Sequence, residues 1–207
     1  MGQRSQIYVR YENSKGVQVA ARYYGWNYGE RMVSRARYII EWLKDGLSSS
    51  DWFLDASATH KKLCRICDTN FDMIDVVLSS DIFAEFREFE EPIETLNDFL
   101  FSGQDNNDGK LLIDIKGKEI RYCFLDCDAD IEHIMTADQY MTWEHDGTIY
   151  SHQAWDIPTE YTNQATIDYT RNNIEAIEEM ARLMSAEEVK EYMSADYSSI
   201  VEEAPQF

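Results

Sequence analysis

The sequence lacks the features that mark a membrane, exported or disulfide-bonded protein. No apolar run approaches the roughly 20 residues that span a bilayer, and residues 1–10 lack the basic start and apolar stretch of a signal peptide. Four cysteines are too few for a disulfide scaffold in 207 residues. We therefore expect a cytoplasmic protein with reduced thiols.

Common catalytic and cofactor motifs are also missing. The chain has no glycine-rich phosphate loop, dinucleotide-binding fingerprint, nucleophile elbow or H-E-x-x-H zinc motif. We therefore expect no cofactor, and the sequence offers no group of residues that would be assigned as catalytic.

Basic residues are scarce, and most of them lie early in the chain. The sequence has 19 Lys and Arg against 39 Asp and Glu, a net charge of -20. Residues 1–67 hold 11 basic and 6 acidic residues, whereas residues 68–207 hold 8 and 33. Because the later part would repel a phosphate backbone, we expect no direct DNA binding. A basic protein surface is the expected partner.

The length suits one core, and the residue pattern predicts a single α+β domain over residues 1–197 with an acidic, mobile tail over 198–207. Alternating apolar and polar residues predict an N-terminal β-hairpin from residues 5–11 and 17–23. Apolar residues at helical spacing then predict a helix over 30–44, ended by Gly46 and packed on the hairpin.

Later segments predict a second hairpin and a helical C-terminal part. The hairpin comprises residues 111–115 and 119–125, a helix follows Asp130 to Met141, and a loop or short hairpin surrounds Asp146-Gly147. The strongest predicted helix covers 163–184, with one face marked by Ile167, Ile174, Ile177, Ala181 and Met184. Further helices are predicted over 57–67 and 82–89, and Ser185 with Glu188 forms a capping box that opens a last helix ending near Met193.

An arginine–aromatic stripe lies in the first predicted helix, where Arg31, Arg35, Tyr38 and Trp42 are spaced i, i+4, i+7 and i+11. Guanidinium and aromatic groups together hold phosphates and stack bases, and they would also fit an acidic partner. The alternative is that both rings belong to the core and that the arginines pair with carboxylates. The excess of carboxylates favours this alternative.

Two groups of residues suggest a metal, although we expect none to be bound. The first offers zinc ligands with buried apolar cysteine as the commoner alternative: His60, Cys64, Cys67, Cys123, Cys127 and His133. The second consists of Asp126, Asp128 and Asp130 after a predicted strand, where carboxylates can bind Mg²⁺.

The aspartate run superficially resembles the nucleophile motif of haloacid-dehalogenase-like phosphatases. That family has Thr or Val where Asp130 stands, and its motif opens a parallel sheet, whereas here the run closes a hairpin. A solvated acidic turn is the favoured interpretation. A metal-dependent phosphoryl-transfer enzyme or nuclease is kept as the alternative function.

The segments Met1–Arg10 and Tyr23–Met32, with the helix that follows, resemble a group of uncharacterised bacteriophage and prophage proteins over about the first 45 residues. The group has no assigned catalytic residues. The resemblance implies a small acidic protein made in an infected bacterial cell. Among such proteins, some anti-CRISPR proteins are similar to this chain in size and charge, and they occupy the basic channel of an RNA-guided nuclease.

These observations lead us to expect a non-enzymatic inhibitor of a host defence system, of the anti-CRISPR type, that mimics the charge of nucleic acid. It would cover a basic nucleic-acid-binding surface, and homodimer formation through the arginine–aromatic stripe stays open. The candidate contact carboxylates are Glu85, Glu88, Glu90, Glu91, Glu94, Glu175, Glu178 and Glu179.

Overall fold

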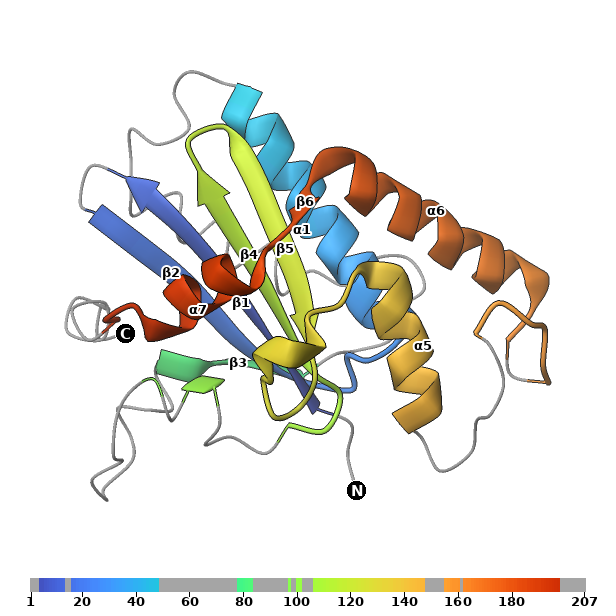
Figure 1. The fold of residues 1–207 in the computed structure, drawn as a ribbon. Helices are drawn as coiled ribbons and strands as arrows, with labels where there is room; N and C mark the ends of the chain where they lie inside the picture. The colour runs from blue at the N-terminus through green and yellow to red at the C-terminus, as the bar shows by residue number, and fades with distance from the viewer. Residues whose placement is uncertain are drawn as a thin grey trace.

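The chain forms a mixed β-sheet with helices on both faces (Figure 1). The computed structural model describes residues 4–13, 16–48, 78–83, 97, 100–101, 106–147, 155–160 and 162–197. Its elements in chain order are β1 Arg4–Asn13, β2 Gly16–Gly25, α1 Glu30–Ser48, β3 Leu78–Asp81, β4 Lys110–Lys116, β5 Glu119–Leu125, the 3-10 turn η2 Ile131–His133, α5 Ala137–Gly147, α6 Gln164–Met180, β6 Arg182–Leu183 and α7 Ala186–Ser194.

The sheet joins two hairpins through a parallel pair of strands. Its order is β3-β2-β1-β4-β5-β6, with antiparallel pairing inside the hairpins β1–β2 and β4–β5. β1 and β4 run parallel at the centre, with Gln6 opposite Lys110 and Arg10 opposite Asp114. Together with the helices this arrangement confirms the predicted α+β class and both predicted hairpins.

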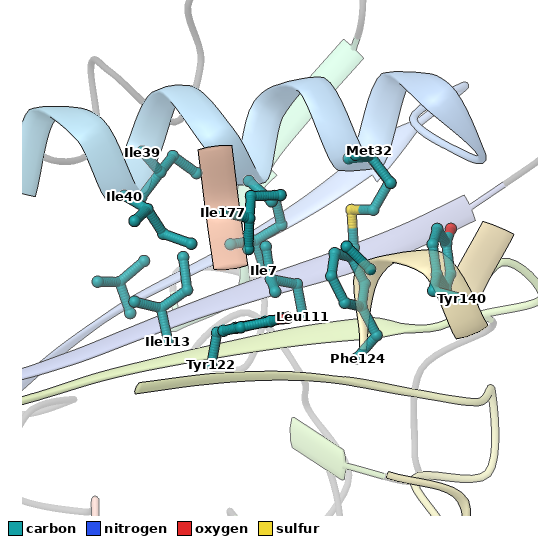
Figure 2. Packing of buried hydrophobic residues seen from close by; sticks show 14 of the residues in the cluster. Ile7, Met32, Ile39, Ile40, Leu111, Ile113, Tyr122, Phe124, Tyr140 and Ile177 are labelled. Carbon is teal, nitrogen blue, oxygen red and sulfur yellow. The ribbon is translucent and has the colours of Figure 1, made fainter. Parts of the chain in front are cut away.

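Two buried apolar clusters lie on the two faces of the sheet, because successive strand side chains point to opposite faces. α1, α5 and α6 cover one face, while Val189 and Tyr192 of α7 belong to the cluster on the other. Figure 2 shows the first cluster, in which side chains of α1 meet side chains of the central strands: Met32, Ile39, Ile40, Ile7, Leu111 and Ile113.

Two predicted helix ends are wrong, because both helices continue beyond them. α1 continues through Gly46 to Ser48, since Leu47 packs against the core cluster and stabilises the last turn. α5 reaches Gly147, so the segment Asp146-Gly147 ends a helix and does not form the predicted loop or hairpin.

The long C-terminal helix ends before its predicted limit. α6 starts after its N-cap Asn163 and stops at Met180, and Ala181 already has an extended backbone. Arg182 and Leu183 then pair with β5 as β6, which takes the chain across the sheet edge. Met184 consequently lies in the cluster on the α7 face, opposite to the face that its helical spacing predicted.

The remaining predictions have mixed outcomes. The capping box of Ser185 and Glu188 is present, and α7 begins after it. β3 was not predicted. Residues 82 and 83 are helical, but most of the predicted helix 82–89, all of the predicted helix 57–67 and the tail 198–207 lie outside the described residues.

We predict that Ser185→Ala lowers the free energy of unfolding by about 1 kcal/mol, because the Ser185 hydroxyl accepts a hydrogen bond from the Glu188 backbone N–H at 3.3 Å. Urea denaturation monitored by circular dichroism measures this loss. Ser194→Ala, at the exposed other end of α7, is the matched control and is expected to change stability little. Equal losses in the two variants would contradict the capping role.

Candidate functional site

A row of charged side chains crosses the sheet on the face covered by α7. Arg10 of β1, Asp114 of β4 and Arg121 of β5 stand opposite one another in register and are each less than a tenth exposed. Arg10 Nε and Nη2 donate to the two Asp114 oxygens at 2.8 and 2.9 Å, and Arg121 Nη2 donates to the same carboxylate. One buried carboxylate thus holds two guanidinium groups.

Glu188 extends this row from α7 to the sheet edge. It accepts from Arg121 Nη1 at 2.6 Å and from Arg182 at 2.8 and 3.0 Å, and Arg182 also binds Glu119 at 3.0 and 3.2 Å. The hydrogen bonds from Arg182, with those from Ser185 and Arg121, hold the pKa of Glu188 well below its usual value despite burial. The network therefore ties α7 to β5 and β6.

Arg10 also packs against an aromatic ring of α7. Its guanidinium lies 4.4 Å from the centroid of the Tyr192 ring, a cation–π arrangement. Burial opposes the charge on Arg10, but the hydrogen bond and charge of Asp114 outweigh it, so the pKa of Arg10 lies above its usual value. The charge of this early arginine is thereby neutralised inside the protein.

Most basic groups among the described residues 4–13 and 16–48 are likewise internal or paired. Arg35 is fully buried, Arg37 lies 3.0 Å from Glu41, and Arg22 lies 4.0 Å from Asp81. Within residues 4–13 and 16–48, Lys44 is the only Lys or Arg side chain that is largely exposed. The basic first third therefore contributes little positive charge to the outer surface of the described chain.

The outer surface of the described residues is consequently acidic. Fifteen Asp and Glu side chains are largely exposed there, against six basic ones: Lys44, Lys116, Lys118, Arg171, Arg182 and Lys190. Glu175, Glu178 and Glu179 on α6 are exposed, and none of them forms an ion pair with another described residue. We call these three residues the α6 carboxylate surface.

α6 lies alongside α1 on the outside of the helical layer (Figure 1). Its buried Ile167, Ile174 and Ile177 face the core, which leaves the α6 carboxylate surface directed outward. The other predicted contact carboxylates, Glu85, Glu88, Glu90, Glu91 and Glu94, lie outside the described residues.

The arginines of the predicted arginine–aromatic stripe do not form a continuous surface. Arg35 is fully buried, its Nε donates to Asn27 Oδ1 at 3.1 Å, and its guanidinium lies 5.0 Å from the Tyr24 ring centroid. Arg31 donates from Nη1 to the Trp26 carbonyl at 3.1 Å. Arg35 is therefore inaccessible to phosphate, to an acidic partner or to a second copy of the chain.

The aromatic half of the stripe belongs to the packing between helices. The Tyr38 hydroxyl lies 3.5 Å from the Tyr169 hydroxyl of α6, and Trp42 packs against the core cluster. Trp42 thus agrees with the alternative interpretation, in which both rings contribute to the core, whereas Tyr38 is half-buried and contacts α6.

The three aspartates after β5 do not converge on one point. Asp126 Oδ1 accepts from the Asp130 N–H at 3.0 Å, and its Oδ2 lies 2.7 Å from His133 Nδ1. Asp130 Oδ1 caps η2 by accepting from the Glu132 N–H at 2.8 Å, while Asp128 is exposed. Among the described residues, no three His, Cys, Asp or Glu side chains are placed to share a metal ion.

The aspartate loop instead closes over a buried lysine that the sequence analysis did not single out. Lys110 is 1% exposed, and its Nζ donates to the Cys127 carbonyl at 2.6 Å. Burial lowers the pKa of Lys110 to about 8, although Cys127, Asp126 and Asp128 oppose this shift. Its position directly before the predicted strand 111–115 is the signal that the sequence offers.

The cysteines in the described residues are free thiols in separate environments. Cys123 is fully buried in the cluster on the α7 face, where burial raises its pKa. Cys127 lies in the aspartate loop and is partly exposed. The other candidate zinc ligands, His60, Cys64 and Cys67, lie outside the described residues.

Comparisons with protein-family models, curated proteins and solved structures gave no match. In the described part of the chain, no helix combines the length and apolar character needed to cross a bilayer.

We predict that Lys110 makes stability rise with pH between about 8 and its ordinary pKa of 10.5. In that range the unfolded chain binds more protons than the folded chain, so raising the pH favours folding. Relative to Lys110→Met, the unfolding free energy of wild type should increase by on the order of 1–3 kcal/mol across this range. Urea denaturation at a series of pH values measures it. Lys118→Met, in an exposed turn, is the control. If the stability difference between wild type and Lys110→Met did not depend on pH, burial of Lys110 would not be the cause.

We predict that Glu188 stabilises the protein at neutral pH and that this contribution declines with acid. Its folded pKa lies below the ordinary value of 4.5, so the stabilisation is complete above that pH and decreases below it, as the unfolded chain takes up the proton. Glu188→Gln keeps an amide that can serve the capping box but removes the charge. Its deficit against wild type should shrink below about pH 4.5, measured by urea denaturation. Glu187→Gln, at an exposed position of the same helix, is the control. An unchanging deficit for Glu188→Gln would refute the ion-pair contribution.

Proposed function

We propose that this protein binds a basic partner protein through its acidic exterior and performs no catalysis. The observation that supports the proposal most directly is the division of charge between inside and outside. Early arginines such as Arg10 and Arg35 are buried, while exposed carboxylates outnumber exposed basic groups. Within residues 4–13 and 16–48 only Lys44 is a largely exposed basic side chain, so the described basic groups there offset little of the acidic surface.

The α6 carboxylate surface is the part of this exterior best arranged for contact. Glu175, Glu178 and Glu179 are spaced i, i+3 and i+4, which brings their Cβ atoms to about 5–6 Å on a helix. Like charges at this spacing repel one another, and a cationic side chain placed between them relieves that repulsion. A surface that presents several lysines or arginines would therefore stabilise α6 while binding it.

The partner in this proposal is a nucleic-acid-binding protein of a host defence system, such as an RNA-guided nuclease. Such a protein carries a basic channel that holds a nucleic acid through its backbone. Clustered carboxylates would attract that channel and accelerate association. The phage origin and the inhibitory role rest on the resemblance of the first 45 or so residues and are part of the proposal.

The alternative, metal-dependent phosphoryl transfer by Asp126, Asp128 and Asp130, gains no support from the described geometry. Two of the three side chains are engaged in holding their own loop, and the loop covers the Lys110 ammonium group. A buried cation beside these carboxylates supplies a structural reason for their presence. The binding function is therefore the better account.

The proposal predicts salt-dependent binding to a purified RNA-guided nuclease that lacks its guide RNA. Between about 50 and 500 mM salt the affinity should fall at least tenfold, because exposed charges are screened. Replacing Glu175, Glu178 and Glu179 together by Gln should lower the association rate by roughly tenfold at low salt. Surface plasmon resonance measures both quantities.

A matched control separates a local contact from the effect of net charge. Replacing Asp128, Glu132 and Asp138 by their amides removes the same number of exposed charges away from α6, and this variant should bind nearly as well as wild type. Equal weakening of the two triple variants would show that α6 is not the contact surface. If the affinity did not change with salt concentration, the electrostatic mechanism would be refuted. If the protein recovered no nucleic-acid-binding protein from a bacterial lysate, the proposed class of partner would be refuted.

A further inference from the structure

The aspartate loop, residues 126–133, leaves β5 and returns beside it, and its base is fixed. Phe124 and Met135 exchange two backbone hydrogen bonds, from the Phe124 N–H at 3.0 Å and from the Met135 N–H at 2.9 Å. Between them the loop passes over Lys110 of β4, whose Nζ donates to the Cys127 carbonyl at 2.6 Å. A short segment with a fixed base can open locally while the sheet stays folded.

Asp126 holds the closed loop together through three contacts. Its backbone carbonyl accepts from the Ala129 N–H at 3.2 Å, its Oδ1 accepts from the Asp130 N–H at 3.0 Å, and its Oδ2 lies 2.7 Å from His133 Nδ1 at the far end of the loop. Ala129 has a left-handed backbone with a φ of 55°, which is unfavourable for a residue other than glycine. The closed loop therefore sets a strained residue against three contacts, and one of these involves a titratable ring.

His133 holds the loop more strongly when its ring is protonated. The side chain of His133 is 63% exposed, whereas that of Asp126 is 10% exposed. The hydrogen bond to Asp126, with the charges of Asp126, Asp130 and Glu132, raises the pKa of His133 above its ordinary value of 6.5. This stabilisation is complete below pH 6.5 and is lost as the pH rises through the raised pKa.

Lys110 acts on the loop in the opposite sense. Burial under the closed loop lowers the pKa of Lys110 to about 8, although Cys127, Asp126 and Asp128 oppose this shift. Below pH 8 the closed loop therefore covers a charged ammonium group, which is unfavourable. This penalty disappears as the pH rises from about 8 to the ordinary pKa of 10.5.

The neighbouring elements add few charges to these two groups. In the sheet Lys110 lies between Gln6 of β1 and Leu125 of β5, which carry no charge. α7 packs against η2, and its Glu188 already holds two arginines. The other charged residues of α7 are Glu187, Lys190 and Glu191. None of the α7 residues is among the groups whose charge acts on His133 or Lys110.

We propose that the aspartate loop is a pH-sensitive lid over Lys110, which closes more firmly when His133 gains a proton and when Lys110 loses one. The lid is least firmly closed between about pH 7 and 8, where the contribution of His133 has declined and the charge on Lys110 is still present. Opening brings the Lys110 ammonium group into contact with water. The lid is separate from the α6 carboxylate surface and does not depend on the proposed inhibitor function.

Hydrogen–deuterium exchange of the full chain tests the proposal, with millisecond quench-flow labelling and mass spectrometry of peptides that cover residues 126–133. Protection is the ratio of the intrinsic to the measured exchange rate, so the direct effect of pH on exchange is removed. It should be lowest between about pH 7 and 8, roughly twofold higher at pH 6 and about fivefold higher at pH 9. The exposed turn at residues 116–119 is the control peptide. Loop protection that does not change between pH 6 and 9, or that changes only in parallel with the control peptide, would overturn the lid.

Two variants separate the two titrating groups. His133→Gln should lose the rise at pH 6 and keep the rise at pH 9, and Lys110→Met should do the reverse, with Lys118→Met as the matched control for the second variant. Melting temperatures establish that each variant is folded. If Lys110→Met does not fold, His133→Gln still decides, because it changes a largely exposed side chain. A rise at pH 6 that persists in His133→Gln, or a rise at pH 9 that persists in folded Lys110→Met, would overturn the assignment of that group.

Discussion

The buried carboxylate of Asp114 is the contact on which the rest of the structure depends. It is shared by Arg10 and Arg121, and it joins the two hairpins at the parallel pair β1–β4. Removing one member of such a buried group typically costs about 3–5 kcal/mol, because the other charges lose their partner. The same contact keeps the positive charges of Arg10 and Arg121 away from the surface. Fold stability and surface acidity thus have a common origin.

Local patterns predicted both hairpins and the main helices, but not the ends of α1, α5 and α6 or the strand β3. The alternation of apolar and polar residues predicted both hairpins, and the spacing of Ser185 and Glu188 predicted the start of α7. The pairing of β1 with β4 was beyond such patterns, because Arg10 and Asp114 are separated by 104 positions. The end of α6 was also missed, since Met184 continues the helical spacing although the chain has already crossed the sheet edge.

In the candidate sites, too, features set by local spacing were predictable and features set by distant residues were not. Exposure of Glu175, Glu178 and Glu179 follows from their position on an amphipathic helix, and so it was open to prediction. The burial of Arg35 was not, because its helical position suits either a surface or a core, and the choice depends on Asn27 and Tyr24 from the preceding turn and strand. The position of Lys110 before an apolar strand is a weak signal of burial, because the burial is completed only when the aspartate loop folds back over the side chain.

The parallel pairing of β1 with β4 has a consequence for synthesis of the chain. The first hairpin leaves the ribosome long before Asp114 is made, and at roughly 5–20 residues per second the interval is about 5–20 s. During this time Arg10 has no carboxylate from β4, and one edge of β1 has no neighbouring strand. This part of the nascent chain is therefore basic and has an open strand edge until the acidic residues that follow it emerge.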